Sequence, residues 1–167
     1  MSTSSTISND ASKHAETADI NELIEVLNDS IAFYKEASEG AIRPDLKALF
    51  HRMIAAKTRI TEELAQAIQL NGDTAATSGT LAGSMRKLYA EVRTKMALDK
   101  NYEYVAQLEE FEDQILHTFQ AAVGDESNIE LCEIAGRYMT AVKVDHDLMR
   151  DLKIVTLRTS RLDRISD

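Results

Sequence analysis

The second half of the chain repeats the first half at an offset of 84 residues, without a gap. Apolar positions coincide over two helix-length stretches, and the glycines that follow the first stretch, Gly40 and Gly124, coincide as well. The other coinciding pairs include Ile24–Leu108, Leu27–Phe111, Ile31–Ile115, Ala37–Ala121, Phe50–Ile134, Ile54–Tyr138, Ile60–Val144, Leu64–Leu148 and Ile68–Leu152. This repeat predicts an all-α fold, a four-helix bundle built from two copies of one helical hairpin.

Helix-start residues set the boundaries of the two hairpins. Two capping boxes and one first-turn proline mark these starts, and they are Asp19 with Glu22, Ser127 with Glu130, and Pro44. We therefore expect the first hairpin over residues 19–70 and the second over 101–157, both within one bundle domain spanning 19–157.

A long connection, residues 71–100, joins the two hairpins. Apolar residues recur in it at spacings of four and three, namely Leu81, Met85, Leu88, Val92 and Met96. The spacing predicts a short crossover helix over 81–97 that packs outside the bundle. A bundle with one crossover connection has the ferritin-like arrangement.

The two ends of the chain are polar. The Ser/Thr-rich residues 1–18 predict a flexible tail without the apolar core of a secretory signal, and residues 158–167 predict a frayed C-terminal tail. No apolar run approaches the roughly 20 residues of a membrane span. Because Cys132 is the one cysteine, nothing requires an oxidising compartment. We expect a cytoplasmic protein that has no membrane partner.

Acidic residues dominate one stretch of a chain whose net charge is −9. Ten acidic residues lie between Asp99 and Glu133, against the single basic residue Lys100. Such a surface repels phosphate backbones, so nucleic acid is disfavoured as a partner. A solvated acidic face is the ordinary interpretation of this stretch.

Five polar side chains are predicted to face the centre of the bundle or its edge. They are Lys57, Thr61, Glu112, Asp145 and, at the edge, His146, whereas Glu25, Asp29 and Glu36 are predicted to point outward. One interpretation is a core polar network of Lys57, Thr61, Glu112 and Asp145, in which the ammonium pairs with one of the carboxylates. A second is a reduced metal site of Glu112, Asp145 and His146, and a third is surface exposure through helix rotation.

The sequence does not supply the ligands of a di-iron centre. Such a centre needs a Glu from each of two helices and a Glu-x-x-His pair from each of the other two, and the chain contains no Glu-x-x-His. Where the repeat would place these pairs it has Thr58-Arg59-Ile60-Thr61 and Val142-Lys143-Val144-Asp145. We expect no cofactor, with iron or another divalent metal as the alternative. No nucleophile motif or phosphate-binding loop is present, so no catalytic residue is predicted.

Several short motifs resemble those of a bacterial ferritin-like family that is known only as a domain of unknown function. They are Asp29, Tyr34 and Ala37; Glu63-Leu64; the crossover leading into Arg86; Glu109 with Glu112-Asp113; and His146-Asp147. The likeness covers roughly residues 20–157 and implies a ferritin-like bundle without an established activity. The chain departs from the family at Phe119, where a tyrosine is usual, and at Lys57 and Thr61.

Two functional hypotheses follow from these observations, and a third, a small-molecule carrier that uses a cavity between helices, has no residue that points to it. The first is a non-enzymatic, stress-associated bundle that binds an unknown protein partner or itself. The second is a ferritin-like metalloprotein that binds or oxidises iron at a reduced site, and it rests on analogy of fold.

Overall fold

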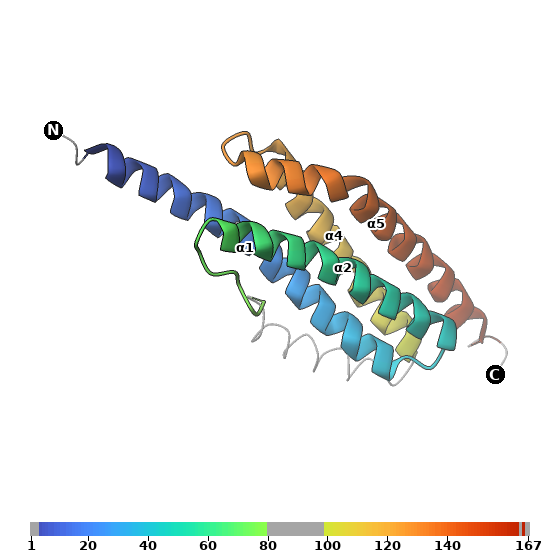
Figure 1. Ribbon diagram of the computed structural model, residues 1–167. Coiled ribbons are helices and arrows are strands. Elements are labelled where there is room, and N and C mark those ends of the chain that lie inside the picture. The colour runs from blue at the N-terminus through green and yellow to red at the C-terminus, as the bar shows by residue number, and fades with distance from the viewer. Residues whose placement is uncertain (1–3, 80–98, 164, 166–167) are drawn as a thin grey trace.

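The protein is all-α in the part that the structure describes. The computed structural model describes residues 4–79, 99–163 and 165, and within them it contains four helices and no strand. The helices are α1 (Ser4–Gly40), α2 (Pro44–Leu70), α4 (Lys100–Gly124) and α5 (Ile129–Asp163), and they lie side by side as a four-helix bundle (Figure 1). This confirms the predicted all-α fold with four helices. The crossover helix predicted over 81–97 lies outside the described residues.

Apolar side chains from all four helices fill the bundle in two clusters. One includes Leu27 and Ile60 from the first hairpin, with Ile115 and Val142 from the second. The other is built mainly from Phe33, Tyr34, Phe50, Met53, Tyr104, Leu108, Phe111 and Met149. Among the described helices, none is both long and apolar enough to cross a membrane.

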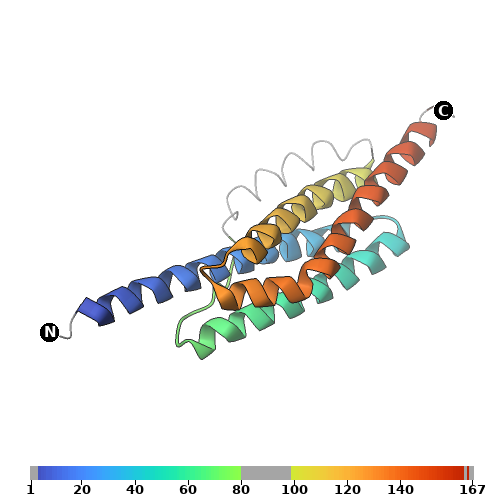
Figure 2. The ribbon, with the colours of Figure 1, turned by 90° about the horizontal axis from the view of Figure 1, so that it is seen from above.

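The helix α1 is longer than the sequence predicted. It begins at Ser4 and passes through Asp19, so residues 4–18 are helical where a flexible tail was predicted, and Asp19 with Glu22 does not form a cap. Extending an existing helix adds one hydrogen bond per residue without a new nucleus. Two contacts hold the base of this extension: Asn128 Nδ2 donates to the Glu16 carbonyl at 2.9 Å, and Thr17 Oγ1 donates to Asp73 Oδ2 at 2.7 Å. Figure 2 shows this end of α1 projecting beyond the bundle.

The cap of α5 also differs from the predicted one. Asn128, rather than Ser127, precedes the helix, and its Oδ1 accepts a hydrogen bond from the Leu131 backbone N–H at 3.1 Å. Ser127 instead donates to Asp125 Oδ1 through both its backbone N–H and its hydroxyl. At its other end α5 continues to Asp163, into the segment that was predicted to fray.

Burial along α5 departs from the offset of 84. Ile60 and Leu64 of α2 are buried, whereas their predicted counterparts Val144 and Leu148 are 59% and 36% exposed. The α5 residues that face the core lie one position further along, and Met149 among them is fully buried. The repeat alone therefore indicates the wrong inward face for this part of α5, whereas the predicted inward position of Asp145 agrees with the face that packs. The helix α5 has two apolar stripes, and only one of them packs into the bundle.

Candidate functional site

A lysine and a glutamate meet in the centre of the bundle. Lys57 lies one turn after Met53 on the apolar stripe of α2, and Glu112 lies between Leu108 and Ile115 on that of α4. The Lys57 ammonium is 2.9 Å from Glu112 Oε1, and the two side chains are 2% and 0% exposed. Because each charge is removed from water, each depends on the other for its stability.

Tyr34 of α1 completes this contact. Its hydroxyl donates to Glu112 Oε1 at 2.7 Å, and the Lys57 ammonium lies 5.5 Å from the centre of its ring, a cation–π distance. Burial raises the pKa of the Tyr34 phenol well above its usual value, and the negative charge of Glu112 raises it further. We call Tyr34, Lys57 and Glu112 the polar layer.

The other two residues of the predicted core network lie beside the polar layer. Asp145 Oδ2 is 3.7 Å from the Lys57 ammonium and its side chain is 23% exposed, so it contributes charge at the edge of the layer. The Thr61 hydroxyl donates to the Lys57 backbone carbonyl at 3.0 Å and does not extend the layer. The structure thus brings Lys57 to both predicted carboxylates, with Glu112 the closer and the more deeply buried.

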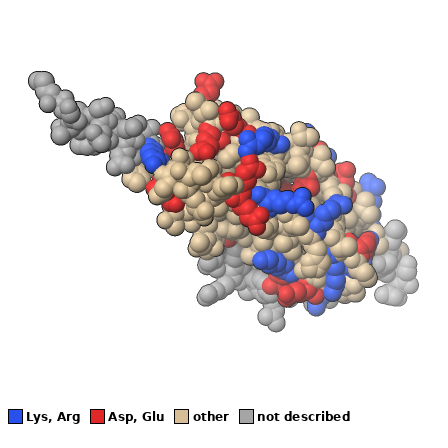
Figure 3. Space-filling model, in the orientation of Figure 1, with Lys and Arg blue, Asp and Glu red and all other residues tan. Residues whose placement is uncertain are grey.

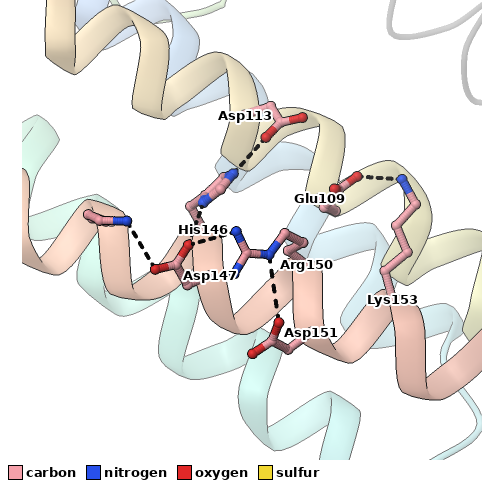
Figure 4. A network of polar contacts seen from close by, with 8 residues as sticks. Glu109, Asp113, His146, Asp147, Arg150, Asp151 and Lys153 are labelled. Carbon is pink, nitrogen blue, oxygen red and sulfur yellow. Dashed lines mark hydrogen bonds and ion pairs between the residues drawn. The ribbon is translucent and has the colours of Figure 1, made fainter.

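His146, the third predicted metal candidate, belongs to a different group of side chains. Figure 4 shows its ring between Asp113 of α4 and Asp147 of α5. Its Nε2 lies 2.7 Å from Asp113 Oδ1, and its Nδ1 lies 3.1 Å from Asp147 Oδ1. The predicted set of Glu112, Asp145 and His146 is therefore divided between the core and the outer surface of the α4–α5 hairpin.

Further ion pairs extend along the outside of this hairpin. Lys143 and Arg150 both contact Asp147, and the hydrogen bond from Lys143, followed by that from His146, lowers the pKa of the Asp147 carboxyl. Lys153 contacts Glu109 (Figure 4). Burial lowers the pKa of the Lys153 ammonium, but the hydrogen bond and charge of Glu109 outweigh this and raise it. The Lys153–Glu109 pair joins α5 to α4, whereas the two pairs to Asp147 lie within α5 on a largely solvated face.

Sequence reasoning missed three buried polar positions. Tyr34 donates to Glu112, a contact that the sequence did not predict. Glu109 was assigned to the acidic surface and is buried against Lys153. Asp29 was predicted to point outward and is 5% exposed, with Gly79 so near that a Cβ there would meet its Oδ1 at 1.8 Å. Segments that are distant in the sequence cover Glu109 and Asp29, and helical periodicity does not predict such contacts.

The polar layer does not fit a di-iron centre. Lys57 places a fixed positive charge against Glu112, the one fully buried carboxylate at this level, and a nearby ammonium repels a divalent cation. Among the described residues, no three His, Cys, Asp or Glu side chains come together in a way that could hold a metal ion. The donor set instead makes a closed ion pair with one additional hydrogen bond.

A family model described as Domain of unknown function (DUF2383) matches residues 15–125. The match covers most of the bundle before α5, and it contains Tyr34, Lys57 and Glu112. No curated protein sequence and no solved structure matches the chain.

Proposed function

The chain belongs to the DUF2383 family, a domain of unknown function, and from its geometry we propose that it is a non-enzymatic, ferritin-like bundle acting through protein contacts. The observation that carries this proposal is the Lys57–Glu112 pair in the centre of the bundle. In a ferritin-like metalloprotein, carboxylates and histidines from the four helices converge on two metal ions at this place.

The ion pair supports a structural role for the centre of the bundle. Its groups satisfy one another, since Glu112 accepts from both Tyr34 and Lys57. Asp145 is partly exposed and lies 3.7 Å from the same ammonium. If the interior holds no reactive group, the function depends on the outer surface, where a protein partner or a second copy would bind. We place this activity in the cytoplasm, because Cys132 is free.

Elemental analysis of the full chain, purified without an affinity tag or chelator, tests the first half of this proposal. We expect substantially less than one iron per chain and no oxidation of added Fe(II) above the buffer rate. Two-metal catalysis needs ions about 3.5–4 Å apart held by bridging carboxylates, which this layer does not offer. Near-stoichiometric iron with Fe(II) oxidation would overturn the proposal in favour of the metalloprotein.

Crosslinking in cells that make the protein tests the second half. The full chain is treated with a short crosslinker, and linked peptides are identified by mass spectrometry. We expect links from surface residues to a recurring partner, or between copies of the chain. A protein that yields only internal links at its natural abundance has no such partner, and the interaction role is then wrong.

A further inference from the structure

The second apolar stripe of α5 faces solvent. Val144, Leu148 and Val155 are 59%, 36% and 53% exposed, and Ala141 beside them is also exposed. Their spacings of three, four and seven place all four on one side of the helix, as in a stripe that a partner helix packs against, and the exposed carboxylate of Asp151, which Arg150 contacts, lies on the same side between Leu148 and Val155. The stripe continues from Arg137, which forms an ion pair with Glu63 of α2.

On α2, a row of arginines begins at the Glu63 end of this ion pair. Arg59 precedes Glu63 by four residues, so it lies one turn away on the same side of α2, and Arg52 lies two turns further. Since α2 and α5 run antiparallel, both stripes lead away from the Glu63–Arg137 pair in the same direction (Figure 1). Beyond that pair the two helices diverge (Figure 2). We call the two stripes together the α2–α5 face.

The α2–α5 face carries arginines that have no ion-pair partner in the described part of the chain, beside the Glu63–Arg137 pair and the exposed carboxylate of Asp151. Arg52 and Arg59 are exposed and have no ion-pair partner among the described residues, and the same holds for Arg158 further along α5. By contrast, Lys143 and Arg150 on α5 both contact carboxylates. Figure 3 shows Lys and Arg side chains over the middle of the visible face, with Asp and Glu side chains beside them. These guanidinium groups are unpaired cations in a chain whose net charge is −9.

We propose that the α2–α5 face binds an acidic amphipathic helix of a partner protein. Apolar side chains of that helix would cover Val144, Leu148 and Val155, and its flanking carboxylates would pair with Arg52 and Arg59, whose planar guanidinium groups suit bidentate contacts. This assignment rests on the proposed function, since it specifies where and by what chemistry a protein partner is bound.

Charge selects this partner over two others. Pairing two copies through the same face would place Arg52 and Arg59 of both copies in one interface and add no carboxylate from a partner, so like charges would oppose the association. An anionic membrane would attract the arginines. It would also meet Glu130 and Glu133, which line a surface pocket with Glu63 and Arg137 at the closed end of the face.

The test uses two synthetic helical peptides and the full chain. The first peptide has three heptads with leucine at positions a and d and glutamate at e and g, and the second replaces every glutamate with lysine. Binding is followed by fluorescence anisotropy. We expect the acidic peptide to bind at least about tenfold more tightly than the basic peptide, and its affinity to fall as salt rises from about 0.05 to 0.3 M.

Two pairs of matched variants locate the binding site. Arg52→Glu with Arg59→Glu should weaken binding of the acidic peptide at least about tenfold. Lys13→Glu with Lys35→Glu makes the same charge change on exposed residues of α1 and should leave it within about twofold. Likewise, Val144→Asp should abolish binding, whereas Ile154→Asp, which is 45% exposed off the stripe, should not. Circular dichroism and thermal melts establish that each variant is folded.

Several results would overturn the assignment. They are equal binding of both peptides, binding that survives the Arg52→Glu/Arg59→Glu change, a dimer in sedimentation that Val144→Asp dissociates, or binding to phosphatidylglycerol vesicles in place of the peptide. If the peptide test fails while crosslinks to a partner map to another surface, this assignment falls and the proposed function stands. Stoichiometric, redox-active iron would instead remove the proposed function itself.

Discussion

At the residue scale, Lys57 is the side chain whose removal should change stability most sharply. Lys57→Met leaves Glu112 as a fully buried carboxylate without its counter-charge, so we expect a loss of about 3–5 kcal/mol in the free energy of unfolding. Adding Glu112→Gln should recover much of that loss. Asp145→Asn should recover less, because the Asp145 side chain is partly exposed and lies 3.7 Å from the ammonium. Urea unfolding of the single and double variants measures the coupling.

A different result would place the lysine in water. If Lys57→Met costs only about 0.5 kcal/mol and the double variants are additive, the ammonium reaches solvent by extending past the helix edge. The two carboxylates would then be free to bind a cation, and the melting temperature of the wild-type protein would respond to a chelator.

Tyr34 should make the protein sensitive to alkali. Burial, followed by the charge and hydrogen bond of Glu112, raises the pKa of its phenol, so the folded state keeps the proton that the unfolded state releases near pH 10. The stabilising contribution is therefore fully present below pH 10 and is lost as pH rises above it. We expect the free energy of unfolding to fall less steeply between about pH 9.5 and 11 in Tyr34→Phe than in the wild type.

The same substitution has a cost at neutral pH. Removing the hydroxyl leaves Glu112 one hydrogen bond short, which should lower stability by about 1.5–3 kcal/mol at pH 7. Absorbance at 295 nm then separates ionisation of tyrosines in the folded state from ionisation that accompanies unfolding. Parallel pH profiles for Tyr34→Phe and wild type would show that the phenol titrates in the folded protein as it does in water.

At the element scale, Asn128 should anchor both the start of α5 and the base of the α1 extension. Its Oδ1 caps α5, and its Nδ2 donates to the Glu16 carbonyl. Asn128→Ala should therefore cost about 1–2 kcal/mol, while Ser127→Ala should stay within about 0.5 kcal/mol. Asn128→Asp keeps the cap and loses the donor, so it should lie between them. Thermal unfolding measures the loss of stability in each variant. If Ser127→Ala costs as much as Asn128→Ala, Ser127 rather than Asn128 caps α5.

The boundaries of α2 could be predicted from sequence, whereas the internal repeat did not give the inward face of α5. Pro44 and the glycine-containing turn after Leu70 are local signals, and α2 has both predicted ends. Along α5 the residues Val142 and Met149 compete with Val144 and Leu148 as an apolar stripe. The internal repeat matched the second pair to buried positions of α2, but the stripe that contains Val142, Met149 and the inward-predicted Asp145 is the one that faces the core. Ser127 and Asn128 are both good N-cap residues, so residue type alone did not decide which of them caps α5.

The candidate site could be predicted where one helix decides the outcome. Lys57 and Glu112 each lie on the apolar stripe of their own helix, and periodicity alone placed them at the core. The hydrogen bond from Tyr34 and the separation of His146 from Glu112 depend on how helices rotate against each other. Such rotation is set by packing between distant segments.

At the scale of the whole molecule, the polar layer divides the apolar interior. Met53 and Ile60 flank Lys57 on α2 and belong to different core clusters, and Phe111 and Ile115 likewise flank Glu112 on α4. A polar layer between two apolar clusters resists sliding or rotation of a helix, because any shift separates a buried charge from its partner. We infer that the layer specifies how the helices pair, at some cost in stability.

Replacing the entire polar layer with apolar residues tests this inference. The triple variant Tyr34→Phe, Lys57→Met, Glu112→Met leaves no buried charge of the layer unpaired, so its stability should equal that of the wild type or exceed it by about 1–4 kcal/mol, in contrast to Lys57→Met alone. With the layer gone, the two apolar clusters merge, and several helix registers become similar in energy. We therefore expect broader amide resonances and faster hydrogen exchange along α2 and α4 despite the higher unfolding midpoint. Sharp, wild-type-like spectra at increased stability would show that apolar packing alone specifies the bundle, and that the polar layer is not needed for helix pairing.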